Sequence, residues 1–249
     1  MEEQTEKRKE IGTISANDRE ELARRTTKKF YEALEELLNS EERVVVSLSG
    51  GRSVQPFYKK IPDMADSLSG GIWRRIHFFW TDERMVPPGS SDSNYGLAKD
   101  LFLGELMERG LVGPDQIHRF PGETSSSKRV IDDYRRDLDR ISNGEVHLPV
   151  LGVGGDGHVG SLFPGSPKLK EDKSSILLVE NSPKPPERRI TISPGVIRES
   201  TYPFLFFIGE EKRDAYKCFR ADTTTYFDCP CKIALAGSSG ICYVVTELV

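Results

Sequence analysis

The stretch VHLPVLGVGGDGH, residues 146–158, passes from a run of apolar residues directly into closely spaced glycines. An apolar run of this length that ends at glycines predicts a buried β-strand followed by a tight turn. The pattern recurs in VVVSLSGG, residues 44–51, and in RIHFFW, residues 75–80, which leads into the polar TDER. Continuous apolar runs are typical of strands that are covered on both faces, so these segments predict neighbours in a parallel sheet.

Helical patterns alternate with these strands. Apolar residues recur at helical spacing after Asn17, where Asn17 or Asp18 would cap the helix, and again over 93–109 and 128–141. The alternation predicts the α/β class, with a largely parallel central sheet flanked by helices. Further strands are expected at 176–181, 188–193, 204–209 and 240–248, and a helix after 204–209.

The domain organisation follows from length and from the lack of linkers. A chain of 249 residues is long enough for one large domain or two small ones. Residues 1–10 have no apolar periodicity, so we predict that they are disordered. No connector is long or low-complexity enough for a domain linker, and residues 11–249 are therefore predicted to form a single domain.

Composition excludes several classes of function. Lys and Arg number 35 against 39 Asp and Glu, a net charge of −4, which disfavours general binding to nucleic acid or to anionic membranes. No stretch approaches the roughly 20 apolar residues of a membrane span, and MEEQTEKRKE lacks the apolar core of a signal peptide. We therefore expect a cytoplasmic protein with no nucleic-acid or membrane partner.

The cysteines and histidines argue against a disulfide framework and a metal site. The four cysteines all lie in the last quarter of the chain, and such clustering indicates reduced thiols. The triplet Cys229-Pro230-Cys231 is not the C-x2-C spacing of zinc sites, and no H-x3-H or H-E-x-x-H motif occurs. We predict no metal and no cofactor. The cysteines are Cys218, Cys229, Cys231 and Cys242.

Polar residues follow three of the predicted strands. Because ligands bind beyond the carboxyl ends of parallel strands, these three segments are expected to meet at one cleft. The Ser49–Ser53 turn could bind a phosphate through backbone N–H groups, hydroxyls and a helix N-terminus. An ordinary tight turn between a strand and a helix would have the same sequence pattern. Asp82 and Arg84 add a carboxylate and a guanidinium, which would also fit a solvated charge cluster.

The third segment ends in Asp156-Gly157-His158 and carries the chemistry. A histidine titrates near neutrality and suits general-base work. Among the other histidines, His77 lies inside an apolar strand and is expected in the core, whereas His118 and His147 are expected to be structural or at the surface.

Several ordered blocks resemble the 6-phosphogluconolactonase family, which is grouped with the glucosamine-6-phosphate isomerases. The blocks are SLSGG (47–51), FFWTDERMVPPGSSDSNY (78–95), IHRFPGE (117–123), LGVGGDGHVGSLFPGS (151–166), SPKPPERRITISP (182–194) and FLFFIGEEKRDA (204–215). The resemblance implies a Rossmann-like three-layer α/β domain. It also implies that the serine–glycine turn holds a phosphate with nearby basic residues, that His158 is the general base, and that Asp156 orients the site.

Two departures from the family pattern stand out. Arg52, Ser53 and Val54 replace a small Ser-Thr followed by Pro, and Val159-Gly160 replaces the more usual Thr-Ala. Neither departure removes a catalytic group, but the first changes the surroundings of the expected phosphate.

The resemblance implies metal-free hydrolysis of 6-phospho-D-glucono-1,5-lactone to 6-phospho-D-gluconate, a step of the oxidative pentose phosphate pathway. Neutral His158 would take a proton from the attacking water and return it to the ring oxygen. Backbone N–H groups of the glycine-rich loop, or Arg84, would stabilise the oxyanion. The expected partner is this small molecule, and we expect a monomer or a weak homo-oligomer. Substrate-binding candidates are Ser49, Gly50, Gly51, Arg52, Asp82, Arg84, Ser93, Asn94, Gly155, Gly157, Arg189 and Lys212.

Two alternatives remain open. Glucosamine-6-phosphate deaminases share the G-x-G-x-D-G-H signature but continue I-A-F-N-E-P, whereas this chain has Phe163 at the glutamate position. Deamination needs several proton transfers, so the missing carboxylate favours lactone hydrolysis. A non-catalytic sugar-phosphate sensor would be expected to carry a broken signature, and Asp156 and His158 are both present.

Overall fold

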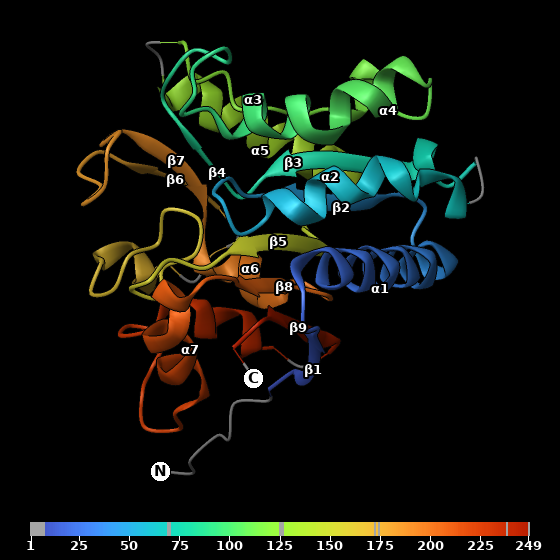
Figure 1. The fold of residues 1–249 in the computed structure, drawn as a ribbon. Coiled ribbons are helices and arrows are strands. Elements are labelled where there is room, and N and C mark those ends of the chain that lie inside the picture. Colours follow the sequence, from blue (N-terminus) through green and yellow to red (C-terminus); the bar gives the residue numbers. More distant parts are fainter. Residues whose placement is uncertain are drawn as a thin grey trace.

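The computed structural model describes residues 8–68, 71–124, 127–171, 173, 175–237 and 239–248. Its centre is a six-stranded parallel sheet in the order β1-β9-β8-β5-β2-β3, with helices on both faces (Figure 1). The α/β prediction with a parallel central sheet is thus confirmed. The strands are β1 Glu10–Ser15, β2 Val44–Leu48, β3 Ile76–Trp80, β5 Leu148–Gly152, β8 Phe204–Phe207 and β9 Ile241–Thr246.

Aromatic contacts assign the helices to the two faces of the sheet. On β3, Phe78 packs edge-on against Phe102 and the next residue, Phe79, packs against Tyr134 on the opposite face. Successive residues of a strand point to opposite faces of the sheet, which is why two consecutive phenylalanines pack against helices of two different layers. The first layer holds α1 Arg19–Ser40, α2 Gln55–Asp63, α3 Asn94–Ala98, a π-helical turn Lys99–Leu103 and α4 Gly104–Glu108, and the second holds α5 Ser127–Ser142 and α7 Arg213–Arg220.

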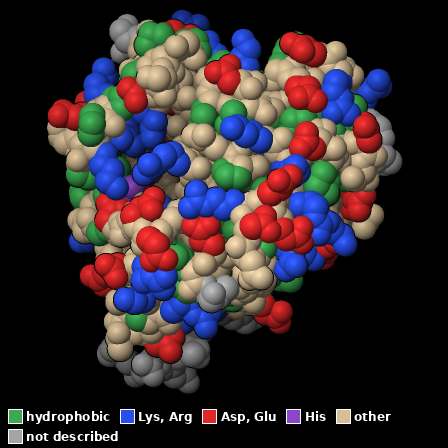
Figure 2. Space-filling view, viewed as in Figure 1, with side chains coloured by type: hydrophobic (Ala, Val, Ile, Leu, Met, Phe, Trp, Pro, Cys, Tyr) green, Lys and Arg blue, Asp and Glu red, His purple; other side chains and the backbone are tan. Residues whose placement is uncertain are grey.

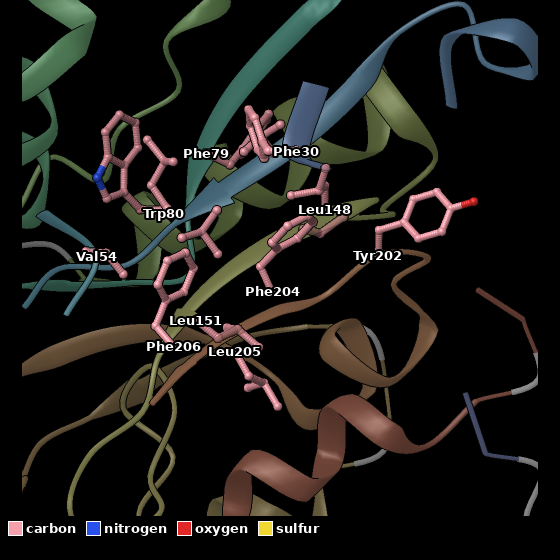
Figure 3. Packing of buried hydrophobic residues seen from close by; sticks show 14 of the residues in the cluster. Phe30, Val54, Phe79, Trp80, Leu148, Leu151, Tyr202, Phe204, Leu205 and Phe206 are labelled. Atoms are coloured by element: carbon pink, nitrogen blue, oxygen red, sulfur yellow. The ribbon is translucent and has the colours of Figure 1, made fainter. Parts of the chain in front are cut away.

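The core is continuous across the middle of the sheet. Phe204 and Phe206 of β8 contact Phe30 of α1 and Phe57 of α2, respectively, at ring-centroid distances of 6.0 and 5.4 Å. Figure 3 shows Leu205 of β8 beside Leu151 of the neighbouring β5, with which it is in register. Burying so many large side chains is the main favourable term in folding, and it fixes the strands whose carboxyl ends form the site.

A second, smaller sheet stands at the carboxyl end of the first. It is antiparallel, in the order β4-β7-β6. Thr81 joins the two sheets, because its N–H donates to Leu48 O at 2.9 Å and its carbonyl accepts from Ile192 N at 2.8 Å. The strands predicted at 176–181 and 188–193 therefore exist, but they belong to this sheet. Its strands are β4 Asp82–Arg84, β6 Ile176–Val179 and β7 Arg189–Ile192, and the short helix α6 Pro194–Glu199 follows.

The start of the chain differs from the sequence expectation. Glu10 begins β1, the edge strand beside β9, and Lys9 is buried with its N–H donating to Leu235 O at 2.9 Å. The prediction of a disordered segment is therefore wrong for Lys9 and Glu10, whereas residues 1–7 lie outside the described part. The strand escaped detection because Ile11 is exposed and EIGTIS has no continuous apolar run.

The predicted helices are present with shifted ends. Asp18 caps α1 by accepting a hydrogen bond from Glu21 N at 2.8 Å. The segment 93–109 is helical but contains the π-helical turn, and α7 starts at Arg213 because residues 210–212 form a 3₁₀ turn. Within the described ranges, no helix is both long and apolar enough to cross a membrane.

Candidate active site

A cleft of about 150 Å³ opens where the carboxyl ends of β2, β5 and β8 meet the second sheet. The chain runs from β2 outward to β3 and returns to β5 on the other side of β2, so the cleft lies at the point where strand order reverses. Open parallel sheets bind ligands at such switch points. The lining residues are Ser49, Gly50, Gly51, Arg52, Ser53, Asp82, Arg84, Gly152, Val153, Gly154, His158, Gly160, Lys184, Arg189, Glu211 and Lys212.

The cleft is cationic although the whole chain is acidic. Five Lys and Arg side chains line it against two carboxylates. Figure 2 shows such basic side chains gathered around a hollow on the left of the view, with a histidine inside it. An excess of fixed positive charge around a concave site attracts small anions. The arrangement therefore suits a phosphorylated ligand.

His158 and Asp156 form a hydrogen-bonded pair at the cleft. His158 Nδ1 bonds to Asp156 Oδ1, and the carboxylate also receives Lys184 Nζ at 3.2 Å. A carboxylate only accepts, so Nδ1 carries the proton and Nε2 is left with a free lone pair. The histidine side chain is 15% exposed and lines the cleft, whereas Asp156 is 38% exposed and does not line it.

The pKa of Asp156 is shifted by opposing causes. Partial burial raises it, but the hydrogen bond and charge of His158, together with the charge of Lys184, outweigh burial and hold the pKa well below its usual range. Asp156 is therefore ionised throughout the neutral range. A fixed negative charge on one side of an imidazole stabilises the imidazolium that forms when the other nitrogen takes a proton.

The absence of a side chain at Gly154 allows the His158 ring to lie where it does. A Cβ on Gly154 would collide with His158 Nδ1, so the ring rests directly on the backbone of its own loop. The loop is closed by Gly154 N–H donating to His158 O at 2.9 Å. On another side the ring meets Phe163 at a centroid distance of 4.7 Å. The position of the histidine is thus determined by backbone and by an apolar wall.

The serine–glycine turn lines the cleft, but Ser49 differs from expectation. Its hydroxyl donates to Val150 O at 2.7 Å and so bridges two sheet strands, which leaves no hydroxyl proton for a ligand. A Cβ on Gly50 would collide with Asn94 Oδ1, and Gly51 has a φ of 101°, which residues with a side chain rarely adopt. The turn therefore offers the cleft backbone groups rather than side chains.

Asp82 and Glu83 point in different directions and have different roles. Asp82 lines the cleft, is buried, and accepts from Ser161 Oγ at 2.7 Å and Asn94 Nδ2 at 3.1 Å. Glu83 accepts from the N–H groups of Asn94 and Tyr95, each at 2.8 Å. Burial raises the pKa of Glu83. Glu83 thus anchors the loop that follows β4 instead of facing a ligand.

Ser93 and Asn94 support the site from behind rather than line it. Ser93 caps α3 by accepting from Gly96 N at 3.1 Å and donates to Glu83 Oε2 at 3.1 Å. Asn94 donates to Asp82 and contacts Gly50. Both were substrate-binding candidates, and the structure shows them bonded to Glu83 and Asp82, which ties down the loop that follows β4.

Arg84 and Arg189 both line the cleft but are held differently. Arg84 donates from Nη1 to Asp92 O at 2.8 Å, and its buried Nε has no hydrogen-bond partner among the described residues. Arg189 is buried, with Nε bonded to Pro186 O at 2.9 Å and Nη2 to Lys184 O at 2.9 Å. Its Nη1 lies 3.9 Å from Asp82 Oδ2. Arg189 therefore fixes the loop that carries Lys184, and Arg84 retains an unused donor.

Arg52, Glu211 and Lys212 form the opposite rim. Arg52 is 90% exposed and its Nη2 lies 3.6 Å from Glu211 Oε1. Burial lowers the pKa of Lys212, with a further contribution from the nearby positive charges. All three line the cleft, which places the departure at residue 52 directly at the mouth of the site.

Gly155 and Gly157 do not line the cleft, contrary to expectation. A Cβ on Gly155 would lie 2.9 Å from Glu211 O, and one on Gly157 would lie 3.2 Å from Cys229 Sγ. Both glycines therefore allow close packing beneath the loop instead of close approach of a ligand. Substrate contact by the other candidates stays a prediction.

A family model described as Glucosamine-6-phosphate isomerases/6-phosphogluconolactonase matches residues 17–242. The chain belongs to this family. Its similarity to 6-phosphogluconolactonase 3, chloroplastic, of Arabidopsis thaliana is 36% identity over 183 residues, covering 68% of this chain and 54% of the relative. The chain thus spans about half the length of that relative.

Solved structures confirm the fold. A 6-phosphogluconolactonase from Thermotoga maritima superimposes with a TM-score of 0.76 at 24% identity, covering 94% of this chain and 98% of the other. A monomeric glucosamine-6-phosphate deaminase gives a TM-score of 0.75 at 16% identity, covering 94% and 97%. Both activities of the family share this fold, so only the residues at the site distinguish them.

Two charged residues of the site escaped the sequence prediction, namely Lys184 and Glu211. Lys184 lies in the proline-rich turn before β7 and reaches Asp156 only through tertiary packing. Glu211 lies in the turn after β8 and pairs with Arg52 on the same rim of the cleft. Lys184 falls inside a block that resembles the family, SPKPPERRITISP, so position in that block was a usable signal.

Proposed function

We propose that this chain hydrolyses 6-phospho-D-glucono-1,5-lactone to 6-phospho-D-gluconate. The observation that carries the proposal is the His158–Asp156 pair at one end of a cationic cleft, with Phe163 in place of a second acid–base group. Lactone hydrolysis needs one group that accepts and returns a proton. The name of the plant relative points to the same activity.

In this proposal the phosphate binds at the rim beside Arg52 and Lys212. The Ser49–Gly51 turn leads directly into α2, whose N-terminus adds a positive potential. Binding of the phosphate would replace the Arg52–Glu211 pair with a stronger, doubly charged acceptor. Held at this end, the sugar ring extends across the cleft toward His158, and the phosphate supplies binding energy away from the reacting carbonyl.

The chemical step uses His158 as the general base. Its Nε2 takes a proton from water as the water oxygen attacks the lactone carbonyl, and Asp156 stabilises the resulting imidazolium. Arg84, whose side chain lines the cleft, stabilises the oxyanion through its guanidinium. The imidazolium then donates to the ring oxygen as the C–O bond breaks. The residues named here complete the cycle with no covalent enzyme intermediate.

Phe163 separates this proposal from deamination. The ring stands against His158 at the position where the deaminase signature has glutamate. An aromatic ring cannot shuttle protons between the sugar carbons and the amine, whereas it can shield an imidazole from bulk water. The cytoplasmic location stays a prediction, since the Arabidopsis relative is named as chloroplastic. The monomeric or weakly oligomeric state is also a prediction.

The test compares three substrates on the purified chain at slightly acidic pH, where spontaneous lactone opening is slow. We expect rapid hydrolysis of freshly generated 6-phosphogluconolactone, slower hydrolysis of unphosphorylated gluconolactone, and no ammonia from glucosamine 6-phosphate. Lys212→Ala should raise KM for the phosphorylated lactone alone, with Lys217→Ala as the control because that side chain is 70% exposed on the outside of α7. Release of ammonia without lactone turnover would contradict the proposal, and binding of sugar phosphates without either reaction would indicate a sensor.

A further inference from the structure

Three of the four cysteines gather directly beneath the loop that carries His158. Cys229 Sγ lies 3.5 Å from Cys231 Sγ, and the thiol of Cys218 on α7 is near enough to lower the pKa of Cys229. Cys229 and Cys231 are buried, and Cys218 is half-buried, so the cluster approaches the surface along α7. The proposed hydrolysis uses none of these thiols.

The cluster contacts the backbone between Asp156 and His158. Cys231 N–H donates to Gly157 O at 2.9 Å, and a Cβ on Gly157 would lie 3.2 Å from Cys229 Sγ. On its other side Cys229 Sγ faces Ala215 O of α7 at 4.0 Å. An atom added to this sulfur would press toward Gly157, and a bond to Cys231 would strain the Cys231 N–H contact with Gly157 O, which lies between Asp156 and His158.

We propose that Cys229 is a redox modification site, at which a hydroperoxide drives formation of a Cys229–Cys231 disulfide that disturbs the loop 154–158. Cys231 is the assigned partner because its sulfur lies at contact distance and because its N–H is bonded to Gly157. The disulfide itself is independent of the proposed function. Its effect on turnover rests on that function.

The chemistry balances with one molecule of hydrogen peroxide. The Cys229 thiolate attacks one peroxide oxygen, the O–O bond breaks, and hydroxide leaves and is protonated to water, which gives a sulfenic acid. The Cys231 sulfur then attacks the Cys229 sulfur, the S–O bond breaks, and the hydroxyl leaves as water with the thiol proton. Two thiols lose two electrons and the peroxide gains them. A dithiol reverses the change by exchange.

The environment of Cys229 favours the first step. Hydrogen bonds from Cys231 and Cys218 lower the pKa of Cys229 to about 7 despite its burial, whereas burial raises the pKa of Cys231. A thiolate at neutral pH is the reactive form toward peroxide. Among the described residues, no group of three Cys, His, Asp or Glu side chains is arranged to hold a metal ion, so the thiols are not assigned to one.

Peptide mapping tests the site without any assay of activity. The chain is treated with hydrogen peroxide, unfolded, alkylated and digested with trypsin without reductant. Cleavage after Arg220 and Lys232 places Cys229 and Cys231 in one peptide, 221–232, whereas Cys218 falls in 218–220 and Cys242 in 233–249. We expect peptide 221–232 unalkylated and lighter by two hydrogen atoms, with Cys242 alkylated. Alkylation of both cysteines of 221–232, or a bridge to 218–220, would overturn the assigned disulfide.

Turnover tests the coupling to the loop. We expect peroxide to lower the lactone hydrolysis rate of the wild type by about tenfold or more, because small displacements of catalytic groups have effects of this size, and we expect dithiothreitol to restore it. Cys229→Ala should keep its rate, with Cys229→Ser as a second variant in case alanine impairs folding, and Cys242→Ala should respond like the wild type. Equal loss in the wild type and both Cys229 variants would overturn the coupling. Because the mapping needs no turnover, failure of the lactonase proposal would remain distinguishable.

Discussion

Asp156→Asn isolates the contribution of the charge behind His158. The substitution keeps the size and one acceptor oxygen but removes the negative charge that His158 Nδ1 and Lys184 Nζ both contact. Asp156 does not line the cleft, so the binding of substrate should change little. The expected effect therefore falls on kcat rather than on KM.

The magnitude follows from the kind of bond that is lost. A hydrogen bond to a charged group is worth about 1.5–3 kcal/mol, which corresponds to a kcat reduced by about 10- to 150-fold. The pair with Lys184 adds little, because both side chains are more than a third exposed and solvent screens them. Since the pKa of Asp156 is held well below its usual range, the wild type keeps this charge at all neutral pH values.

The assay is steady-state hydrolysis of the lactone by the wild type, Asp156→Asn and Glu211→Gln. Glu211 is the matched control, because it is a carboxylate at the same cleft that pairs with Arg52 and has no contact with His158 among the described hydrogen bonds and ion pairs. We expect Glu211→Gln to alter KM alone. If Asp156→Asn turned over like the wild type, or if only its KM changed, the role assigned to the carboxylate would be refuted.

Three further predictions concern stability and the shape of the site. Burial lowers the pKa of His118 to about 4, below the unfolded value of about 6.5. The contribution of His118 to stability is therefore full above pH 6.5 and falls by up to about 3 kcal/mol toward pH 4. Urea unfolding at neutral and acidic pH should show a smaller loss of stability in His118→Asn than in the wild type, and an equal loss would contradict the assignment. Glu83→Gln should lower the free energy of unfolding by about 1–3 kcal/mol, because Asn94 N–H and Tyr95 N–H bond to different carboxylate oxygens and glutamine replaces one of those oxygens by an amide nitrogen that cannot accept. An unchanged melting temperature would disprove this. Gly154→Ala should lower kcat by about 100-fold, because a Cβ there displaces the His158 ring, and wild-type kcat in this variant would show that the ring position is unimportant.

The strand ends were the most predictable part of the molecule. Continuous apolar runs at 44–48, 76–80 and 148–152 identified parallel strands, and parallel strands bring their carboxyl ends to one edge. That rule alone places Gly51, Arg84 and His158 around one cleft, as observed.

The remaining features depend on tertiary contacts that leave little local signal. Lys184 comes from a turn of the second sheet, and that sheet is joined to the first through Thr81, which bonds to both sheets. Ser49 was expected to offer its hydroxyl, but the sequence does not show that Val150 O lies within its reach. Edge strand β1 was missed because a half-exposed strand at the border of a sheet lacks the apolar run of a central strand.

The most direct test of the proposed mechanism is lactone hydrolysis by His158→Ala beside the wild type, with binding of 6-phosphogluconate measured by calorimetry on both. A general base contributes about 10²- to 10⁴-fold to the rate, so we predict a kcat lower by that factor with binding of the product retained, because the basic residues of the cleft remain. Hydrolysis by His158→Ala at the wild-type rate would contradict the mechanism.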